Sequence, residues 1–509
     1  MGRQSNYSTG IYNQLQEVME RLSAMEHTHQ QDHSELRRLN CVVKSQENEL
    51  ATLRATAQKQ NEELDSLRVE NKSLKEENIK LKNDNERMKR ILNNNSSNTS
   101  LPPSSDPPGK AANTYNGRKR SGKKKGGQAG HKGTGLTKEA VEERIRQGKL
   151  QHKIETIGLP CGRYVVRYRL DLDIQAIATE IRIYQDENGK YPVPASLKAE
   201  VSYGPAVKSM ISFLYSEGVV SNERISGFIN SISGDALAVS GGTIYNACRQ
   251  FSELCRKTLP AIEEDLLNST VLCTDATVMT INGAQACIRN ISNPRSARYV
   301  GAAQKTIKSM MGMPVLPQFT GIIEHDHETA LYHFGTGHGE CNVHLCRYLK
   351  KNTEETGNSW SRNLEGFLKG MAHAIKEKKA GGETRFTEEE LLRYEARYDA
   401  IVGQGEEQGK TTKGKYAREE EQKLLRRLKK YRKSHLLFLH NFEVPFSDNM
   451  SERDLRKCKN RQKMAGGFRL MRGMEMYCSI LSFIETVKRR KMNIYFSIIS
   501  LFNGVPVIK

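Results

Sequence analysis

The sequence predicts an α+β protein built from several domains. Its 509 residues exceed what one hydrophobic core normally supports, so we expect about three structural units. A heptad pattern fills the first ninety residues, and later segments with strand-like alternation are flanked by long segments with helical periodicity. Together these observations predict an N-terminal parallel coiled coil, a basic linker, a small mixed helical region and an α/β core interrupted by helices.

The composition indicates an anionic partner and a reducing compartment. Lysine and arginine total 79 against 59 acids, and the net charge of +20 makes nucleic acid the first candidate partner. The ten cysteines form no CxxC pair, which argues against a disulfide framework or a four-cysteine zinc module. No apolar run approaches the roughly 18 residues of a membrane helix, and the N-terminus is too polar for a signal peptide. We therefore expect no membrane partner and a cytoplasmic location.

Residues 11–92 keep one heptad register, which predicts a coiled coil between two chains. The d positions are Ile11, Val18, Met25, Leu39, Leu53, Leu67, Leu74, Leu81 and Met88, and the a positions are Leu15, Leu22, Leu36, Val43, Leu50, Ala57, Leu64, Asn71, Asn78, Asn85 and Leu92. Three successive asparagines at a favour a parallel two-stranded pairing, hence a homodimer. A disordered polar helix is the alternative interpretation.

The linker over residues 93–136 is rich in Asn, Ser, Pro, Gly and Lys, a composition that builds no core. Residues 110–132 hold eight Lys or Arg and no acid. We favour phosphate tracking or minor-groove insertion by this arm over a merely solvated charge run, because it lies beside a dimerising coil. The expected DNA contacts are Arg118, Lys119, Arg120, Lys123, Lys124, Lys125, His131 and Lys132.

Two small regions follow the linker. Residues 137–200 are expected to be β-rich, with a turn at Asn188-Gly189. Residues 201–268 are expected to be helical. Within them, a helix over 221–232, a turn at Gly234 and a second helix capped near Ser240 have the outline of a helix-turn-helix. Simple packing of two short helices is the alternative.

Strand patterning returns in residues 269–349, where Asn282-Gly283 predicts a hairpin. The expected strands cover residues 271–273 before Asp275, 278–281, 286–291, 298–302 and 320–325 before Asp326, with a helix at 305–311. Three hairpin-like strands, a helix and a further strand are the order of a ribonuclease-H-like core.

An all-helical insertion is expected over residues 350–440, before residues 441–509 complete the core. It is expected to contain a capping box at Thr387 to Glu390 and a long basic amphipathic helix from about Ala417.

Three acids are candidate metal ligands: Asp275 at the end of the first core strand, Asp326 at the end of the fourth, and Glu452 at the start of a later helix. Carboxylates at the ends of neighbouring strands can converge, and two Mg²⁺ ions need such oxygen ligands when a phosphodiester is cut in line. Each acid taken alone is more often a surface or capping residue, and Asp448 and Ser451 are good N-cap candidates.

Several motifs, in order along most of the chain, resemble those of the bacterial insertion-sequence-66 family of transposases. They are Pro102-Pro103-Ser104-Ser105-Asp106-Pro107-Pro108, Gly126-Gly127-Gln128-Ala129-Gly130-His131-Lys132-Gly133, Thr274-Asp275-Ala276-Thr277, Cys341-Asn342-Val343-His344 with Arg347, and Asp448-Asn449-Met450-Ser451-Glu452-Arg453-Asp454-Leu455-Arg456. The resemblance implies a DDE enzyme that cuts and joins DNA at the ends of a mobile element. It also implies Asp275, Asp326 and Glu452 as ligands of two Mg²⁺ ions, with Mn²⁺ as a substitute.

The sequence departs from the family pattern at three places. Only Cys161 stands where family members have a cysteine-pair zinc module, so we expect no zinc there. Ala276 replaces the usual glutamate after Asp275, and we expect activity to survive because that residue points away from the metal face of a strand. Asp326 has an unusual context, and Glu324 and Glu328 are its alternatives, as Glu475 and Glu485 are for Glu452.

Further DNA contacts are expected near the acids. Cys341 and His344 share one helix face, and without a second pair nearby we prefer a structural role for them over a metal site. Residues 453–472 contain eight Lys or Arg and one acid, which would place cations beside the scissile phosphate. The expected contacts are Arg347, Arg453, Arg456, Arg461 and Lys463.

The leading hypothesis is a metal-dependent transposase that acts on double-stranded DNA at element ends and targets, on the nucleoid, with possible accessory proteins of the same element. A non-catalytic coiled-coil DNA-binding protein or transposase remnant is the alternative. A third interpretation, a ribonuclease-H-like nuclease without strand transfer, shares the same site. The distance between the carboxylates discriminates the first two.

Overall fold

The computed structural model describes residues 60–95, 98–99, 136–157, 165–172, 174–194, 197 and 199–508. The predicted coil up to residue 59 and all eight basic-arm residues lie outside this part. The chain forms two compact units, one of residues 1–106, 184–228 and 239–509 and the other of residues 107–183 and 229–238. None of the helices in the described ranges is both long enough and apolar enough to cross a membrane.

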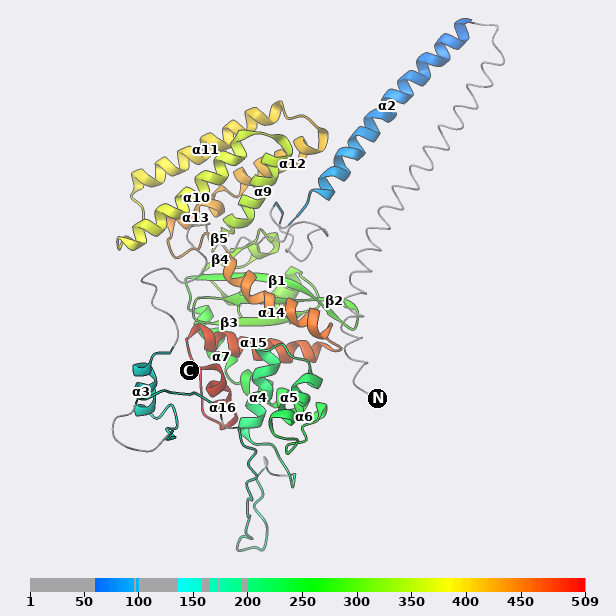
Figure 1. Cartoon of the computed structure of the whole chain (residues 1–509). Helices are drawn as coiled ribbons and strands as arrows, with labels where there is room; N and C mark the ends of the chain where they lie inside the picture. Colours follow the sequence, from blue (N-terminus) through cyan, green and yellow to red (C-terminus); the bar gives the residue numbers. More distant parts are fainter. Residues whose placement is uncertain are drawn as a thin grey trace. The chain divides into compact units, whose positions relative to one another are not determined.

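A five-stranded mixed sheet lies at the centre of the larger unit (Figure 1). Its spatial order is β3-β2-β1-β4-β5, with β1 antiparallel to β2 and parallel to β4. The strands are β1 (Val271–Ile281), β2 (Ala284–Ser292), β3 (Ala297–Ala302), β4 (Ile322–His325) and β5 (Gly337–Glu340). Strand β1 is the central strand of the sheet, and its pairing changes from antiparallel on the β2 side to parallel on the β4 side.

The predicted hairpin is confirmed at Asn282-Gly283. Both residues have positive φ, 48° and 82°, as a two-residue turn between twisted strands requires. The first two expected strands are one continuous strand, because pairing with β2 runs through Asp275 opposite Asn290. Asp275 therefore lies in the middle of β1, and its expected place at a strand end was wrong.

Strand β5 was not predicted, because two of its four residues are glycine and so short a segment carries no alternation. Gly339 nevertheless has a structural reason, since a Cβ there would collide with the carboxyl of Glu324 on β4. The buried Glu324 side chain thus requires glycine beside it on β5.

Helices α14 (Asn449–Ala465) and α15 (Met471–Arg489) pack against the sheet (Figure 1). Helix α15 covers the edge strand β3, whose Ala297 and Tyr299 amides donate to the hydroxyls of Thr486 and Ser482. An edge strand otherwise presents unpaired amides to other chains. The hydroxyls of α15 satisfy these donors and close that edge.

A second group of helices packs on α15: α4 (Pro205–Ser216), α6 (Gly241–Arg256), α7 (Leu259–Leu267) and α16 (Ile494–Phe502). Phe251 of α6 contacts Phe483 and Phe502 with ring centroids 5.8 Å apart in both pairs. The N-cap is Ser240, whose hydroxyl accepts from the Thr243 amide as predicted. Helix α6 is therefore fixed along one side and at its start.

The helix-turn-helix interpretation is only partly matched. Helix α5 (Asn222–Ile232) and α6 occur where expected, and Gly234 between them has a φ of 59°. Eight residues, 233–240, connect the helices, whereas the motif uses a turn of three to four residues. Groove recognition by α6 stays a prediction.

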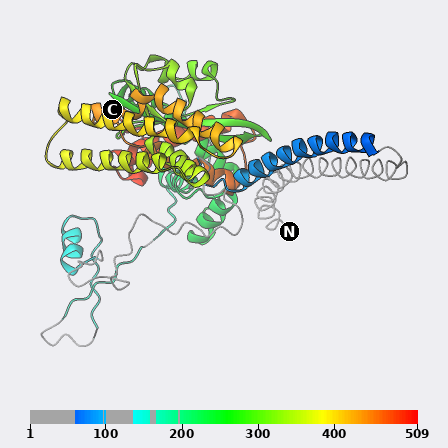
Figure 2. The same ribbon diagram turned by 90° about the horizontal axis from the view of Figure 1, so that it is seen from above.

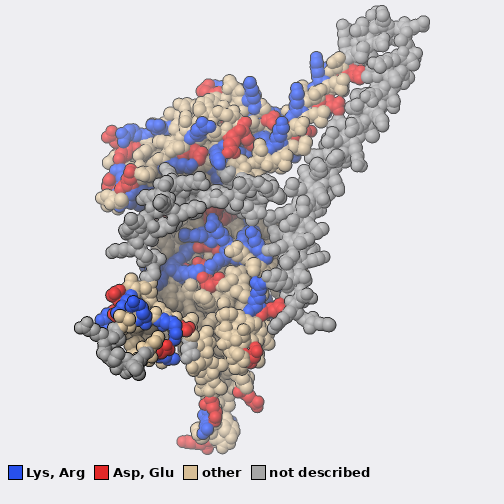
Figure 3. Space-filling model, in the orientation of Figure 1, with Lys and Arg blue, Asp and Glu red and all other residues tan. Residues whose placement is uncertain are grey.

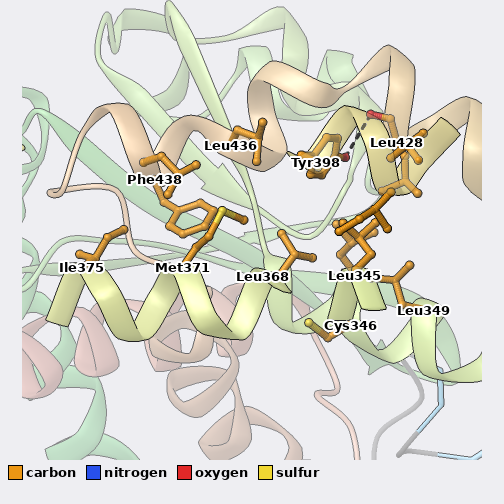
Figure 4. Packing of buried hydrophobic residues seen from close by; sticks show 14 of the residues in the cluster. Leu345, Cys346, Leu349, Leu368, Met371, Ile375, Tyr398, Leu428, Leu436 and Phe438 are labelled. Atoms are coloured by element: carbon orange, nitrogen blue, oxygen red, sulfur yellow. Dashed lines mark hydrogen bonds between the residues drawn. The ribbon is translucent and has the colours of Figure 1, made fainter. Parts of the chain in front are cut away.

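The all-helical insertion consists of α9 (Asn342–Thr356), α10 (Ser359–Ala380), α11 (Glu388–Lys410), α12 (Lys415–Lys430) and α13 (Arg432–His440). Helices α10 and α11 lie side by side (Figures 1 and 2). Their buried faces meet α9, α12 and α13 in one apolar cluster that includes Leu345, Leu368, Met371 and Phe438 (Figure 4). The predicted capping box is present, with Thr387 and Glu390 each bonding the other's amide. The insertion thus has a hydrophobic core of its own.

One buried carboxylate joins three helices of this insertion to the loops between them. Glu421 of α12 is fully buried and accepts hydrogen bonds from the Trp360 indole at 2.7 Å and the Asn358 amide at 2.7 Å. Asn352 of α9 and the Thr412 hydroxyl also donate to it. Buried donors that lose their only acceptor cost stability, so these bonds depend on residue 421.

The expected strands in residues 137–200 are absent from the described part of that region. It begins with helix α3 (Lys138–Arg146), and residues 165–172 and 174–194 carry no strand. The turn at Asn188-Gly189 is present, closed by the Asp186 amide on the Lys190 carbonyl at 2.8 Å. A β-branched segment forms a stable strand when a neighbouring strand pairs with it and one of its faces is covered. Ile157, Val165 and Ile177 are exposed, so their faces are not covered.

Helix α2 (Gln60–Leu92) covers the last part of the predicted coil. Leu74 and Leu81, two d positions, are exposed in this single chain, 38% and 39% respectively. Leu92, an a position, is 70% exposed. The predicted helix is therefore observed over these residues, and Leu74, Leu81 and Leu92 of its apolar seam are exposed in one chain.

We predict that Glu421→Ala lowers the free energy of unfolding by about 3 kcal/mol, because it leaves the Trp360 indole without its acceptor and removes one of the two bonds of the Asn358 side-chain amide. Glu421→Gln should restore most of this loss, since its amide oxygen accepts the same two bonds and its NH₂ group faces the Thr412 hydroxyl. Urea unfolding followed by the fluorescence of Trp360 measures both. The matched control is Glu420→Ala, because the neighbouring Glu420 is exposed and pairs with Lys423. An equal loss of stability in this control would refute the role of Glu421.

Candidate catalytic site

Asp275 is placed at the centre of the sheet by β1. Its carboxylate accepts a hydrogen bond from the Ala276 amide at 2.6 Å. Lys305, in the segment before helix α8 (Ile307–Met311), donates its ammonium group to the Ala276 carbonyl at 2.5 Å. A cation from a different segment therefore lies next to the first candidate acid, a neighbour that the sequence did not suggest.

Asp326 and Glu452 lie on either side of one histidine. Asp326 follows β4, Glu452 lies in the first turn of α14, and His344 lies in the first turn of α9. The His344 Nδ1 atom is 3.4 Å from an Asp326 oxygen, and its Nε2 atom is 3.7 Å from a Glu452 oxygen. Three elements distant in sequence thus bring two of the three predicted acids together.

Arg347 approaches the same carboxylate, with its guanidinium 3.5 Å from Glu452. It lies one helical turn after His344 on α9, so the two side chains share a face. The sequence predicted Arg347 as a phosphate contact, and the structure places it beside a candidate metal ligand. His344 was missed as a site residue; the signal available was its spacing of three from Arg347.

Burial and mutual repulsion dominate the electrostatics of these acids. Burial and the charge of Asp326 raise the pKa of Asp275 to about 6, although the Ala276 amide and Lys305 lower it. Burial and the charge of Glu452 likewise raise the pKa of Asp326, while Arg427 and Arg347 lower it. The negative charge of one acid therefore raises the pKa of its neighbour, as expected for carboxylates held close together.

A fourth carboxyl, Asp448, belongs to this group. It precedes α14, is 3% exposed, and its amide donates to the Cys341 sulfur at 3.3 Å. Burial, then the charges of Asp275 and Asp326, raise its pKa well above the ordinary value. The bond from the Asp448 amide gives Cys341 a structural contact at the start of α9. Asp448 was expected only as a helix cap, but it lies within electrostatic range of Asp275 and Asp326.

His344 is held in its neutral form. Burial lowers its pKa to about 4, and the nearby Arg347 charge acts in the same direction. A neutral imidazole can donate one hydrogen bond and accept one. Between two carboxylates it separates like charges without adding a positive charge of its own.

The alternative acids have other surroundings. Glu328 forms a two-bond ion pair with the buried Arg289, at 2.6 and 2.8 Å. Glu324 is fully buried beneath the site, and burial raises its pKa well above the ordinary value. Glu485 pairs with Lys457 at 2.5 Å, and Glu475 is exposed on α15.

A buried ion network supports the loop that carries Asp326. Glu340 on β5 is bonded by His327, Tyr332, Arg427 and His435. Burial alone would raise the pKa of Glu340, but the bonds from His327 and His435 and the Arg427 charge hold it well below its ordinary range. His327, directly after Asp326, has a φ of 39°, and its bond to Glu340 keeps this strained residue in place.

Some basic side chains of α14 are exposed to solvent, whereas Arg461 makes contacts within the protein. Arg453, Arg456 and Lys463 are exposed on one face of the helix, and Figure 3 shows lysine and arginine gathered in a hollowed surface over α14. Arg461 instead donates to the Tyr215 hydroxyl at 2.9 Å and lies 4.1 Å over that ring. Its guanidinium fixes α14 to the neighbouring helices.

Within the described ranges, no group of three or more His, Cys, Asp or Glu side chains is close enough together to hold a metal ion. Asp326 and Glu452 are brought together by His344, and Asp275 and Asp448 lie within electrostatic range of Asp326. The arrangement is a pair of acids, Asp326 and Glu452, on either side of an imidazole, with Arg347 beside Glu452 and Lys305 beside Asp275. Such a site can bind cations and, on its basic border, phosphate.

Two known families match the chain. Residues 45–137 match a family of unknown function (DUF6444), and no curated protein matches the chain. Residues 202–476 match the Transposase IS66 family. This match covers more than half of the chain and includes the sheet, the insertion and the acids Asp275, Asp326, Asp448 and Glu452. The chain belongs to the IS66 family of transposases.

Proposed function

We propose that this protein is a DDE transposase with a ribonuclease-H-like core, which binds the ends of an insertion sequence and catalyses metal-dependent DNA cleavage and strand transfer. The family makes transposition its process and DNA its partner. The observation that carries the proposal is the meeting of Asp326 and Glu452 around His344, with Asp275 in the same electrostatic field.

The donor set fits a magnesium ion. Asp275, Asp326 and Glu452 offer only carboxylate oxygens, the ligands that Mg²⁺ prefers, and they repel one another in its absence. A pair of such ions would supply Lewis-acid stabilisation of charge on the attacking and leaving oxygens of a phosphodiester. Mn²⁺ is an expected substitute. Asp448, which faces the same acids, is available as a further carboxylate.

The chain's own residues would hold and orient the DNA. Arg453 and Arg456 follow Glu452 directly on the exposed face of α14, so phosphates on that face lie next to the acids. Arg347 places one more guanidinium beside Glu452. His344 lies between Asp326 and Glu452, with its ring nitrogens 3.4 and 3.7 Å from their oxygens. The basic arm from Arg118 to Lys132 would add sequence-independent affinity through phosphate contacts.

A non-catalytic DNA-binding protein is the second candidate function. It is favoured by one observation, the absence of a preformed group of three metal-binding side chains in the described residues. Both candidates bind DNA, so only cleavage or metal binding distinguishes them.

We predict that Asp275→Asn, Asp326→Asn and Glu452→Gln each abolish Mg²⁺-dependent strand cleavage, by at least about 100-fold, and leave DNA affinity within about threefold. The amide keeps the shape of the carboxylate and removes the charge that holds the cation. Cleavage of a labelled element end and a filter-binding assay measure the two effects. Glu475→Gln on the exposed face of α15 is the control. Full cleavage by Asp326→Asn would show that the second ligand is misassigned.

The raised pKa of Asp275 predicts a pH-dependent stability difference in metal-free protein. Its pKa is near 6 in the fold and lower in the unfolded chain, so the unfolded chain ionises first as the pH rises, and the resulting loss of stability builds up between about pH 4 and about pH 6. Asp275→Asn should therefore be more stable than wild type by about 2 kcal/mol at pH 8, and the gain should vanish below about pH 3, where the carboxyl is protonated in both states. Thermal unfolding in EDTA measures this, with the exposed Glu253→Gln as control. Added Mg²⁺ should raise the wild-type Tm at pH 8 and not that of the variant. Equal stability at pH 8 would contradict the placement of this charge.

We predict that α2 joins two chains, because its d-position residues Leu74 and Leu81 are exposed in one chain. Leu74→Glu with Leu81→Glu should weaken self-association at least about tenfold by analytical ultracentrifugation. Ile79→Glu, also exposed but off the predicted seam, should change it little. If the double variant sediments like wild type, another surface forms the oligomer.

A further inference from the structure

A cavity of about 300 Å³ lies in the helical insertion, between α9 and α12 and the end of α2. Four of its lining side chains are cations: Arg90, Lys351, Lys423 and Arg427. Glu355 and Glu420 are its acids. Excess positive charge in a concave surface attracts anions.

This cavity continues the catalytic site along α9. His344 and Arg347 face the acids, and Lys351 follows Arg347 after one helical turn on the same side of α9. Arg427 of α12 connects the two places, because it lies 5.2 Å over the Tyr348 ring in the cavity and its charge lowers the pKa of Asp326. A basic path therefore leads from Glu452 through Arg347 to the cavity.

The cations of the path differ in how firmly they are held. Arg427 is bonded to the buried Glu340 at 2.8 Å, and Arg90 to Glu355 at 2.7 Å, so both are fixed parts of the fold. Lys351 is 3.8 Å from Glu355, and Lys423 pairs with Glu420 where both side chains are more than half exposed. The exposed Lys423–Glu420 pair contributes little and is readily exchanged for another anion. Lys351 is 22% exposed, but its 3.8 Å separation from Glu355 is too long for a hydrogen bond, so its ammonium group is also available to another anion. The two lysines are thus the cations that a ligand can engage.

We infer that this path, which we call the insertion track (Arg347, Lys351, Lys423), binds the phosphate backbone of the DNA strand that leaves the catalytic acids. The inference rests on the proposed function and assigns the helical insertion a role in it. A DNA backbone matches the track because it is a repeating anion that can pass both Glu452 and the cavity, whereas a small anion would occupy the cavity alone. The phosphates displace Glu420 and Glu355 from the two lysines.

The test is the salt dependence of DNA binding by the full-length protein. The probe is a 40-bp duplex of arbitrary sequence, and its affinity is measured by fluorescence anisotropy over a series of KCl concentrations in EDTA. Lys351→Ala with Lys423→Ala should reduce the slope of log affinity against log salt by about two, since each lost phosphate contact removes about one. Lys351→Arg with Lys423→Arg should keep the wild-type slope.

The matched control is Lys350→Ala with Lys429→Ala, on the same two helices. Both lysines are paired with glutamates, Glu354 and Glu406, and neither lines this cavity. An unchanged slope in the first alanine pair, an equal reduction in the control pair, or a loss in the arginine pair would each overturn the track. Wild-type protein that binds no DNA would overturn the proposed function, whereas wild-type binding with an unchanged slope in the first pair would overturn the track alone.

Discussion

The site depends on carboxylates that repel one another and are nevertheless held in one place. Their positions come from β1, from the end of β4 and from α14, and the parallel pairing of β1 with β4 fixes the first two at adjacent strands. Helix α14 is fixed separately, through Arg461 between the rings of Tyr215 and Tyr477 and through the Asp454–Arg489 ion pair. Under the proposed function, a bound cation would relieve the repulsion that the backbone cannot, so the rigidity of the scaffold would contribute to cation affinity.

The helical insertion acts on this site from outside the sheet. It carries its own apolar core, and its α12 and α13 supply Arg427 and His435 to Glu340, the residue that holds His327 in a strained conformation beside Asp326. Removing the insertion would therefore leave a buried acid without its cation. For this reason we regard the insertion and the sheet as one functional body rather than as a core with an independent appendage.

Local signals in the sequence predicted much of the fold. Asn282-Gly283, the capping box at Thr387 and the cap at Ser240 each depend on a few neighbouring residues, and the structure confirms all three. The strands expected in residues 137–200 are absent from the described part of that range, because the sequence pattern does not reveal whether a strand has a partner. Strand β5 was missed because Gly339 makes sense only against Glu324 on the neighbouring strand. The three acids were candidates from their expected places at strand ends and a helix start, and the family resemblance supported them. Lys305, His344 and Asp448 became candidate site residues only once distant segments were seen together.

The closed edge of the sheet has a consequence for synthesis of the chain. Ser482 and Thr486, which satisfy the amides of β3, follow that strand only after the whole helical insertion. While the polypeptide emerges from the ribosome, β3 is complete about 180 residues before the helix that covers it, roughly ten seconds or more at usual elongation rates. During that interval the unpaired amides of β3 are exposed and can pair with strands of other chains. Premature termination before α15 would leave this strand uncovered permanently, so truncated copies of such an element should yield aggregating rather than merely inactive protein.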